Sequence, residues 1–318
     1  MLKNYTRELS VAAALGLVLL ALAIFAPAFY EAQPLLSLVA RQAPVLVIAA
    51  GMTLVIICRQ IDISVGSQYA ICSVVAGLVA ARLGAAHWPI AAISLVAMLT
   101  SIATGAFLGA LNGALIAGLR LPSIVVTLAT MVTLRQGLNM VRQGEFVNLP
   151  DGMLWFGLNQ IPGQVSLIVG ALVLLGLMAL AMRHLAAGRF VYAVGTDAEA
   201  ARLAGIRPQW VTFCVFVLMG ALTGLAAMMN IVESPQVQPS SGGGLELIAI
   251  ASVVVGGVSI SGGRGNLGGV LVGVLLLSCI NPALTHLKIV PYWEKAIQGV
   301  IILLAVVSDG LRSRKSGG

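Results

Sequence analysis

The chain has 318 residues, of which 59% are hydrophobic and only 9% are charged. A soluble domain carries roughly 25% charged residues, so this composition excludes a chain whose whole surface faces water. The net charge of +7 does not indicate nucleic-acid binding, because the basic residues lie at the ends of apolar runs, where they report membrane topology. The four cysteines lie in or beside apolar runs, without the spacing of a metal or redox site.

Ten apolar runs predict an all-α protein with about ten transmembrane helices in one permease domain over residues 1–318. Helices are expected because an unclosed strand leaves its backbone unsatisfied in lipid. A span needs about 20 residues, so the fourth run is too long for a vertical crossing and should tilt or kink. The runs are about 9–29, 38–58, 62–82, 88–118, 122–141, 164–183, 209–232, 244–260, 267–287 and 293–311.

The Lys and Arg residues set the expected orientation. They gather before the first run, between the sixth and seventh runs, and after the tenth, and an even number of spans places these three regions on one side. We therefore expect both termini and the loop at about 184–207 in the cytoplasm, and the long loop at about 142–163 outside. The first run follows basic residues as a signal peptide does, but its length favours an uncleaved span.

Small residues recur at four-residue steps in two of the runs. This small-xxx-small pattern lets helix backbones approach closely and predicts a tightly packed bundle. The rows are Ser101, Gly105, Gly109 and Gly113, and then Gly269 and Gly273.

Two segments in expected antiparallel helices match at identical spacing. Asn112, Ala114, Leu115 and Pro122 align with Asn281, Ala283, Leu284 and Pro291. Inverted repeats of this kind are common in transporters, and chance similarity in an Ala- and Leu-rich chain is the other explanation.

A few polar or aromatic side chains within the runs are candidates for a substrate pathway. Amides such as Asn112 and Asn281 donate to and accept from hydroxyl groups, and Phe107 offers a flat apolar face. Arg135 is a further candidate, and each of these is also explained by helix–helix contacts. Asp62, near Arg59 at the expected cytoplasmic boundary, is either a structural pair or cap, or part of the pathway.

The loop between the sixth and seventh runs carries a short helix with its own start and stop signals. Thr196 and Glu199 fit a capping box, and Gly205 fits a C-terminal stop. The acids near the start and the base near the end suit the helix dipole. We expect a polar-faced cytoplasmic helix over 196–205, either an ordinary interfacial helix or a lever that docks on a cytoplasmic partner. Its residues of interest are Thr196, Asp197, Glu199, Arg202, Leu203 and Gly205.

Four segments, in order, resemble permease subunits of the monosaccharide-type ATP-binding-cassette importers, the ribose, xylose, rhamnose and autoinducer-2 group. Besides the loop just described, they are Arg59-Gln60-Ile61-Asp62-Ile63-Ser64-Val65-Gly66-Ser67, Leu121 to Leu128, and the glycine-rich stretch from Gly256 to Gly265. Members often have Gly-Gly where this chain has Arg59-Gln60, a departure that is similar to autoinducer-2 permeases.

The resemblance implies a permease that is not itself an enzyme and that moves a monosaccharide or small polyol by alternating access. It implies a second permease subunit, identical or homologous, an ATPase that binds ATP and Mg²⁺, and an external substrate-binding protein, in a bacterial inner membrane. The chain itself shows no phosphate-binding loop, metal site or cofactor motif. Gly263 to Gly268 matches G-x-G-x-x-G, but between two spans it indicates tight packing or a reentrant turn. An ion-coupled transporter and a branched-chain amino-acid importer permease are the alternatives.

Overall fold

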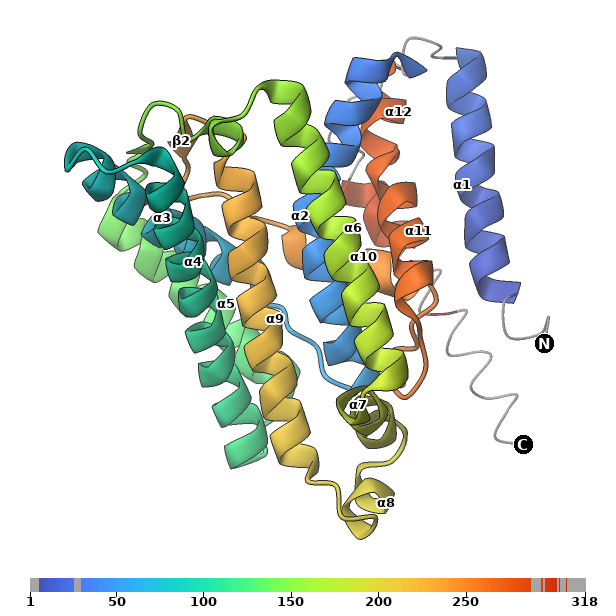
Figure 1. Cartoon of the computed structure of the whole chain (residues 1–318). Helices are drawn as coiled ribbons and strands as arrows, with labels where there is room; N and C mark the ends of the chain where they lie inside the picture. Colours follow the sequence, from blue (N-terminus) through green and yellow to red (C-terminus); the bar gives the residue numbers. More distant parts are fainter. Residues whose placement is uncertain are drawn as a thin grey trace.

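Apolar helices make up most of the described chain, with two very short strands between them (Figure 1). The computed structural model describes residues 6–25, 30–286, 293, 295–301, 303 and 307. The elements are, in chain order, α1 (Thr6–Phe25), α2 (Ala32–Ile57), α3 (Val65–Ala85), α4 (Ile90–Gly113), η3 (Ala114–Gly118), α5 (Ser123–Arg142), β1 (Val147–Asn148), η4 (Leu154–Gly157), α6 (Gln160–His184), α7 (Ala186–Thr196), α8 (Ala198–Leu203), α9 (Pro208–Ile231), β2 (Gln236–Val237), α10 (Leu245–Val255), α11 (Leu267–Ser278) and α12 (Ile280–His286).

The all-α membrane architecture expected from the sequence is confirmed, with seven described helical stretches long and apolar enough to cross a membrane. The expected eighth span, 244–260, is corrected: α10 has 11 residues, about 17 Å at 1.5 Å per residue, against a hydrocarbon core of about 30 Å. It ends at Gly256 and Gly257, where Gly257 takes a positive φ of 101° and turns the chain. The expected tenth span, 293–311, lies only partly within the described residues.

Helix α2 forms the centre of the bundle. Every residue from Ala43 to Ile57 is buried, and α2 packs against α6, α9, α10 and α11. Helix α9 joins this centre to α4 through the predicted row of small residues. A Cβ on Gly105 would overlap the carbonyl oxygen of Gly220, and the Ser101 hydroxyl donates to the carbonyl of Gly224 at 2.7 Å. The small-xxx-small pattern therefore does bring two helix backbones into contact.

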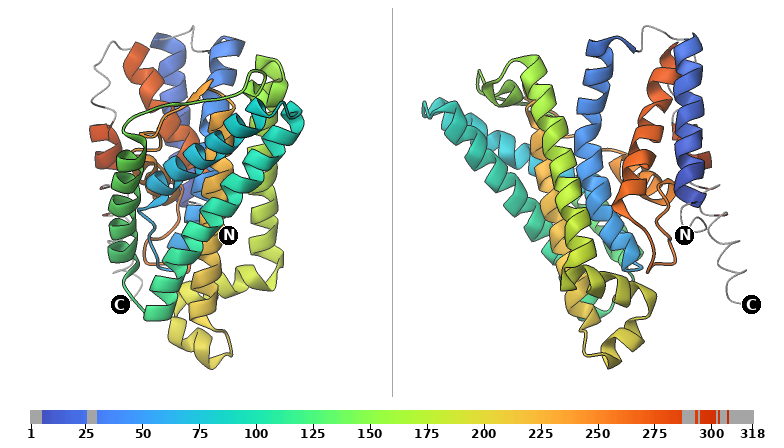
Figure 2. Two further views of the ribbon diagram at one scale, coloured as in Figure 1. Left: turned by 90° about the vertical axis from the view of Figure 1, so that its left-hand side faces the viewer. Right: turned by 45° about the vertical axis from the view of Figure 1, so that its right-hand side comes forward.

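The fourth span departs from a straight vertical helix, as its length predicts. Helix α4 continues into the π-helical turn η3, and together they cover the 29 residues Ile90–Gly118. Figure 2 shows α4 crossing the bundle obliquely. Tilting is how a span longer than the membrane core stays within it.

Two chain segments without regular structure enter the bundle. The chain leaves α2 at its lower end and climbs through residues 60–63 to the start of α3 near mid-height (Figure 1). The segment 238–244 precedes α10 and contacts the same place, because Gly242 leaves no room for a Cβ beside the carbonyl of Gly66. Irregular backbone at membrane depth is tolerated where protein buries it or where it lines a water-filled cavity.

The two ends of the bundle carry different loops. At the upper end of Figure 1, β1 and β2 pair antiparallel and join the loops that follow α5 and α9. At the lower end lie α7 and α8, two short helices where the sequence analysis expected one. The 142–163 and 184–207 loops thus occupy opposite ends, whereas the side of the membrane that each faces stays a prediction.

The outer surface of the bundle is apolar. Helix α6 exposes a series of large aliphatic side chains, and α4 exposes Phe107 with 69% of its surface accessible. In water such a surface would be unstable, whereas in a membrane it meets lipid or another membrane helix. The described structure is consistent with a multi-pass membrane protein on this ground as well as by helix length.

Candidate functional site

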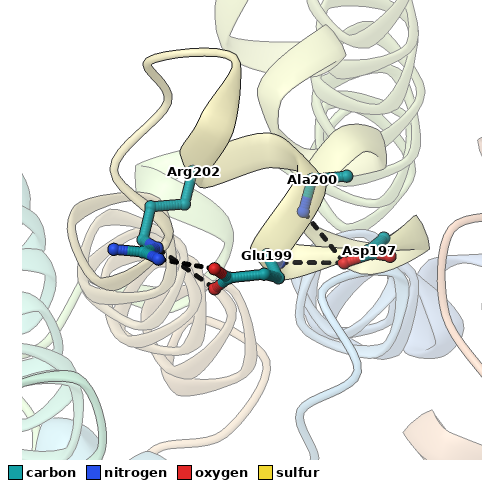
Figure 3. Close-up of polar contacts among 4 residues, drawn as sticks. All are labelled: Asp197, Glu199, Ala200 and Arg202. Atoms are coloured by element: carbon teal, nitrogen blue, oxygen red, sulfur yellow. Dashed lines mark hydrogen bonds and ion pairs between the residues drawn. The ribbon is translucent and has the colours of Figure 1, made fainter.

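The lower end of the bundle presents α8 as a short exposed helix with a complete cap. The Asp197 carboxylate accepts hydrogen bonds from the backbone N–H groups of Glu199 and Ala200 at 2.9 and 3.0 Å (Figure 3). At the other end of α8, Gly205 takes φ +84°, and the N–H groups of Gly205 and Ile206 bond to the carbonyls of Arg202 and Ala201. This is the Schellman arrangement, so the predicted stop at Gly205 is confirmed.

The predicted capping box at Thr196 is wrong. Thr196 is the last residue of α7, and its hydroxyl donates back to the carbonyl of Tyr192 at 2.8 Å. Asp197, with extended backbone at φ −157°, is the N-cap instead. Glu199 therefore does not reach back to a cap residue but bonds to the Arg202 guanidinium, with Nε to Oε2 at 3.1 Å. Asp and Ser/Thr are comparable N-caps, so the sequence alone placed the cap one residue early.

The charges of α8 are fixed by local contacts. The backbone N–H groups of Ala200 and Glu199 hold the pKa of the Asp197 carboxyl below its ordinary value. The hydrogen bond and charge of Arg202 lower the pKa of Glu199. Both acids are therefore ionised at neutral pH and fully exposed, beside a Leu203 side chain that is 80% accessible. An apolar tip among oriented charges is a surface suited to protein contact rather than to chemistry.

At mid-height a buried polar cluster joins α3, α4 and α5. Asp62 is fully buried and accepts hydrogen bonds from the backbone N–H of Ser64 at 2.9 Å, from the Ser64 hydroxyl, and from Gln68 Nε2 at 3.4 Å. The Ser64 hydroxyl accepts from Asn112 Nδ2 at 2.8 Å, and Asn112 Oδ1 accepts from the Thr130 hydroxyl at 2.8 Å. We name this the polar cluster: Asp62, Ser64, Gln68, Asn112 and Thr130.

The contacts of Asp62 within the polar cluster agree with a structural cap at the start of α3, and a role in the substrate pathway stays a prediction. Among the described residues, Asp62 accepts hydrogen bonds from Ser64 and Gln68, just before and within the first turn of α3, where an acid also suits the helix dipole. Arg59 bonds elsewhere, to the carbonyls of Ser261 and Thr196. Asn112 likewise has no accessible surface, and its amide nitrogen and oxygen each bond to a neighbouring element. Ser64, Gln68 and Thr130 were not singled out from the sequence. For Ser64 the signal is the Asp-x-Ser pattern before α3, which is typical of a helix start, whereas Thr130 lies within α5 and has no such signal.

Arg135 clamps the irregular segment 238–244 against the start of α3. Its guanidinium donates to the carbonyl of Gly66 at 2.9 Å and to that of Ser241 at 2.9 Å, with a longer contact to Pro239 at 3.4 Å. Glu246, in the first turn of α10, also interacts electrostatically with Arg135. Arg135 is thus a backbone staple at the point where two helices begin.

The structure does not bring Asn281 to Asn112. Asn281 lies on α12 and lines a hollow of about 490 Å³ between α2 and the C-terminal helices, together with Ser37, Arg41 and Gln298. Both views in Figure 2 place α12 and α4 apart in the bundle. Phe107 faces outward on α4 and contributes to neither place. Among the described residues, Asp62 and Asn112 share the polar cluster and Arg135 bonds nearby to Gly66, whereas Asn281 and Phe107 lie elsewhere. The expected inverted repeat stays a prediction.

Unlike the buried candidates Asp62 and Asn112, several polar side chains of helix α5 are exposed. This helix packs mainly against α3 and leaves most of its surface open, including the polar residues Thr133, Gln136 and Asn139. The Asn139 amide lies 3.5 Å from the Gln136 side-chain oxygen, so these two groups form one polar face. Exposed amides at membrane depth face a partner helix or water rather than lipid.

Helices α3 and α10 begin or end within the bundle, its exterior is apolar, and the capped helix α8 lies at one end. Together these features indicate a polytopic membrane transport protein. Residues 35–306 match the family described as branched-chain amino acid transport system / permease component, and the chain belongs to this family. The resemblance found in the sequence to permeases of ATP-binding-cassette importers is confirmed.

The most similar relatives include importer permeases that align along nearly the whole chain. The ribose import permease protein RbsC of Escherichia coli (strain K12) is 34% identical over 304 residues, which cover 92% of this chain and 91% of the relative. The autoinducer 2 import system permease protein LsrC of Enterobacter sp. (strain 638) is 33% identical over 311 residues, 98% of this chain and 88% of the relative. The probable ABC transporter permease protein y4mJ of Sinorhizobium fredii is 30% identical over 316 residues, 98% of this chain and 92% of the relative. No solved structure matches the chain.

Proposed function

We propose that this chain moves a monosaccharide or a similar small polyol into the cytoplasm as the permease subunit of an ATP-binding-cassette importer. The observation that carries the proposal is the similarity along nearly the whole chain to permeases named for ribose and autoinducer 2 import. The exposed polar face of α5 supports it, because amide groups such as Gln136 and Asn139 exchange hydrogen bonds with hydroxyls in both directions.

The chain works within a larger assembly in the bacterial inner membrane, with both termini in the cytoplasm. A second permease, identical or homologous, covers part of the exposed apolar surface. An ATPase subunit binds ATP and Mg²⁺ and contacts α8, whose Asp197, Glu199, Arg202 and Leu203 are exposed at the lower end. A substrate-binding protein delivers the sugar to the opposite end, near the β1–β2 pair.

The mechanism is alternating access driven from the cytoplasmic end. Closure of the ATPase subunits on ATP pushes α8 and α7, and the permeases open outward to accept substrate. Hydrolysis returns them to the inward state. The substrate binds only weakly, because a deep site would hold it instead of releasing it. No catalytic residue is needed in this chain, since the bond broken is in ATP, which the partner holds.

The first test is uptake by the reconstituted assembly. Vesicles containing this permease, its ATPase and the binding protein should accumulate labelled ribose only when ATP is supplied on the cytoplasmic side. Excess unlabelled ribose or rhamnose should compete, and excess leucine should not. Competition by leucine alone would favour the alternative of a branched-chain amino-acid importer permease, the transport system for which the family is named.

The second test separates the proposal from an ion-coupled transporter. Vesicles with the permease alone should show no uptake when a sodium or proton gradient is imposed. Of the described carboxylates near the membrane, Asp62 is enclosed in the polar cluster, Glu246 opens α10 beside Arg135, and Glu233 lies half-buried just after α9. Gradient-driven accumulation without ATP would overturn the proposal.

A further inference from the structure

Three chain segments meet at one point just above α8. They are the C-terminal end of α2, the C-terminal end of α7 and the glycine-rich segment 256–266 between α10 and α11. The N–H of Gly263 donates to the carbonyl of Ile57 at 2.9 Å, and a Cβ on Gly195 would overlap that same carbonyl oxygen. The Tyr192 hydroxyl donates to the carbonyl of Gly265 at 2.7 Å. The glycines of this segment thus allow close backbone contact, in agreement with the tight packing that the sequence analysis inferred from the G-x-G-x-x-G match.

Arg59 joins all three segments with one side chain. Its Nε donates to the carbonyl of Ser261 at 2.7 Å, and its Nη2 donates to the carbonyl of Thr196 at 2.7 Å. The Thr196 carbonyl belongs to the last turn of α7, where helix carbonyls lack intrahelical partners and a cation is favourable. Arg59 also interacts electrostatically with Asp197, the cap of α8.

The backbone at Arg59 is held in an unfavourable conformation. Its φ is +59°, a region that non-glycine residues seldom occupy. The N–H groups of Arg59 and Gln60 donate to the carbonyls of Ile56 and Val55, so this left-handed residue closes a Schellman cap at the end of α2. Here it lets the chain turn out of α2 while the guanidinium reaches back toward α7 and Ser261.

From Arg59 the chain runs directly to the polar cluster. The N–H of Ile61 donates to the Ser123 hydroxyl at the start of α5 at 3.2 Å. Asp62 and Ser64 then enter the polar cluster, which holds α4 through Asn112 and α5 through Thr130. We name residues 59–64 the strut. It is bonded at one end to the last residue of α7, next to the cap of α8, and at the other end to the start of α3, to α4 and to α5.

We propose that Arg59 is a positioning residue that makes the strut move with α7 and α8, and so carries their displacement to α3, α4 and α5. The proposal rests on the proposed function, in which the ATPase pushes α8. A guanidinium that bonds to two separate backbone segments fixes both the distance and the relative orientation of those segments, which a single flexible contact does not. Since α5 carries the exposed polar face, movement of the strut changes the surface that meets the substrate.

The test compares Arg59→Gln with Arg59→Lys and a matched control, in the complete importer reconstituted in vesicles. Arg120→Gln is the control, because Arg120 lies near the same end, has φ +56°, and makes no hydrogen bond to the described residues. The quantities measured are ATP hydrolysed, ribose imported, ATPase subunit retained on purification, and melting temperature.

We expect Arg59→Gln to raise the ATP hydrolysed per ribose imported by about tenfold, within the range typical of coupling between sites. Arg59→Lys keeps the charge but loses the paired N–H donors of the guanidinium, so its ratio of ATP hydrolysed to ribose imported should lie between those of Arg59→Gln and wild type. Arg120→Gln should have the wild-type ratio. Melting temperature and bound ATPase should stay unchanged, which a purely structural loss would not allow.

An unchanged ratio for Arg59→Gln in an importer whose wild type couples well overturns the strut proposal. A lower melting temperature that accounts for the whole loss of uptake also overturns it. If the Arg59→Gln complex cannot be purified, Arg59→Lys decides, and a wild-type ratio there counts against the proposal. A wild-type assembly that neither hydrolyses ATP nor imports ribose instead contradicts the proposed function, so the two failures are distinct.

Discussion

The amide of Asn112 on α4 donates a 2.8 Å hydrogen bond to the hydroxyl of Ser64, just before α3 begins. The same side chain accepts a bond from Thr130 on α5. One fully buried residue therefore links α4 to α5 and to the start of α3. A buried amide of this kind stabilises packing, and removing it leaves its partners unsatisfied.

We predict that Asn112→Leu lowers stability rather than substrate recognition. The substitution removes both bonds and leaves the Thr130 hydroxyl with only its own helix carbonyl, that of Val126, as acceptor. Measured losses for polar contacts between membrane helices average about 0.6 kcal/mol, and an unsatisfied buried group costs roughly 1–3 kcal/mol. Thermal unfolding in detergent should show a lower melting temperature, with the affinity for ribose in uptake unchanged. A normal melting temperature together with a raised KM for ribose would instead favour the pathway interpretation.

We predict that Gly105→Ala destabilises the bundle. The added Cβ would overlap the carbonyl oxygen of Gly220, which is backbone and cannot swing aside. Overpacking of this kind costs roughly 1–3 kcal/mol. Gly170→Ala is the matched control: Gly170 lies within α6, and a Cβ there meets nothing within 4 Å. That control should be neutral or stabilise the helix by about 0.5–1 kcal/mol. Equal melting temperatures for the two variants would show that α4 and α9 do not approach as described.

Long apolar runs and small-residue rows could be read from the sequence because each follows directly from the physics of a membrane. An apolar run longer than the hydrocarbon core has few alternatives to a helix, and a row of Ser101, Gly105 and Gly109 has little purpose except close packing. The all-α architecture and the close packing at these rows were therefore predicted correctly, whereas the partner helix, α9, was not identified.

The sequence analysis could not predict where a helix ends within an apolar run. Residues 244–260 are apolar enough to span, but the helix stops at Val255 because Gly256 and Gly257 turn the chain back toward the lower end. Hydropathy does not distinguish a half-length helix followed by a buried loop from a full span. The glycines were visible, but a glycine in an apolar run is as often a packing site as a stop.

The candidate site was predicted in part. The location of a short capped helix and its stop at Gly205 followed from local hydrogen-bond chemistry, and only the cap moved, from Thr196 to Asp197. The pathway residues were chosen as single polar groups within spans. Whether such a group faces a cavity or a neighbouring helix depends on tertiary packing, and for Asn112 the neighbours are 48 and 18 residues away in the chain.

We predict that Asp197→Ala uncouples ATP hydrolysis from uptake while the protein still inserts and folds. Asp197 is exposed and its carboxylate caps α8, so its loss frays the helix without opening the core. Asp197→Asn keeps an accepting oxygen and should retain more coupling than Asp197→Ala. Asp151→Ala, an exposed acid in the loop at the opposite end, is the control. Uptake and hydrolysis are measured together in vesicles, and equal coupling in Asp197→Ala and wild type would remove α8 from the ATPase contact.

The last prediction concerns which side of the membrane each end of the bundle faces. The loops at 142–163 and 184–207 lie at opposite ends, and the basic residues favour the cytoplasm for the second. Single cysteines at Asn148 and Ala200 test this, because both residues are exposed and neither side chain contributes to a helix cap. The background replaces Cys58, Cys72, Cys214 and Cys279, of which Cys214 is exposed.

In right-side-out vesicles, a membrane-impermeant maleimide should label Asn148→Cys and spare Ala200→Cys until the membrane is permeabilised. In inverted vesicles the pattern should reverse, since the reagent then meets the α8 end first. Labelling of Ala200→Cys from outside, with Asn148→Cys protected, would invert the orientation and place α8 where no cytoplasmic ATPase could reach it. The ATPase contact and the strut proposal would then both lose their physical basis, whereas the fold and the polar cluster would stand.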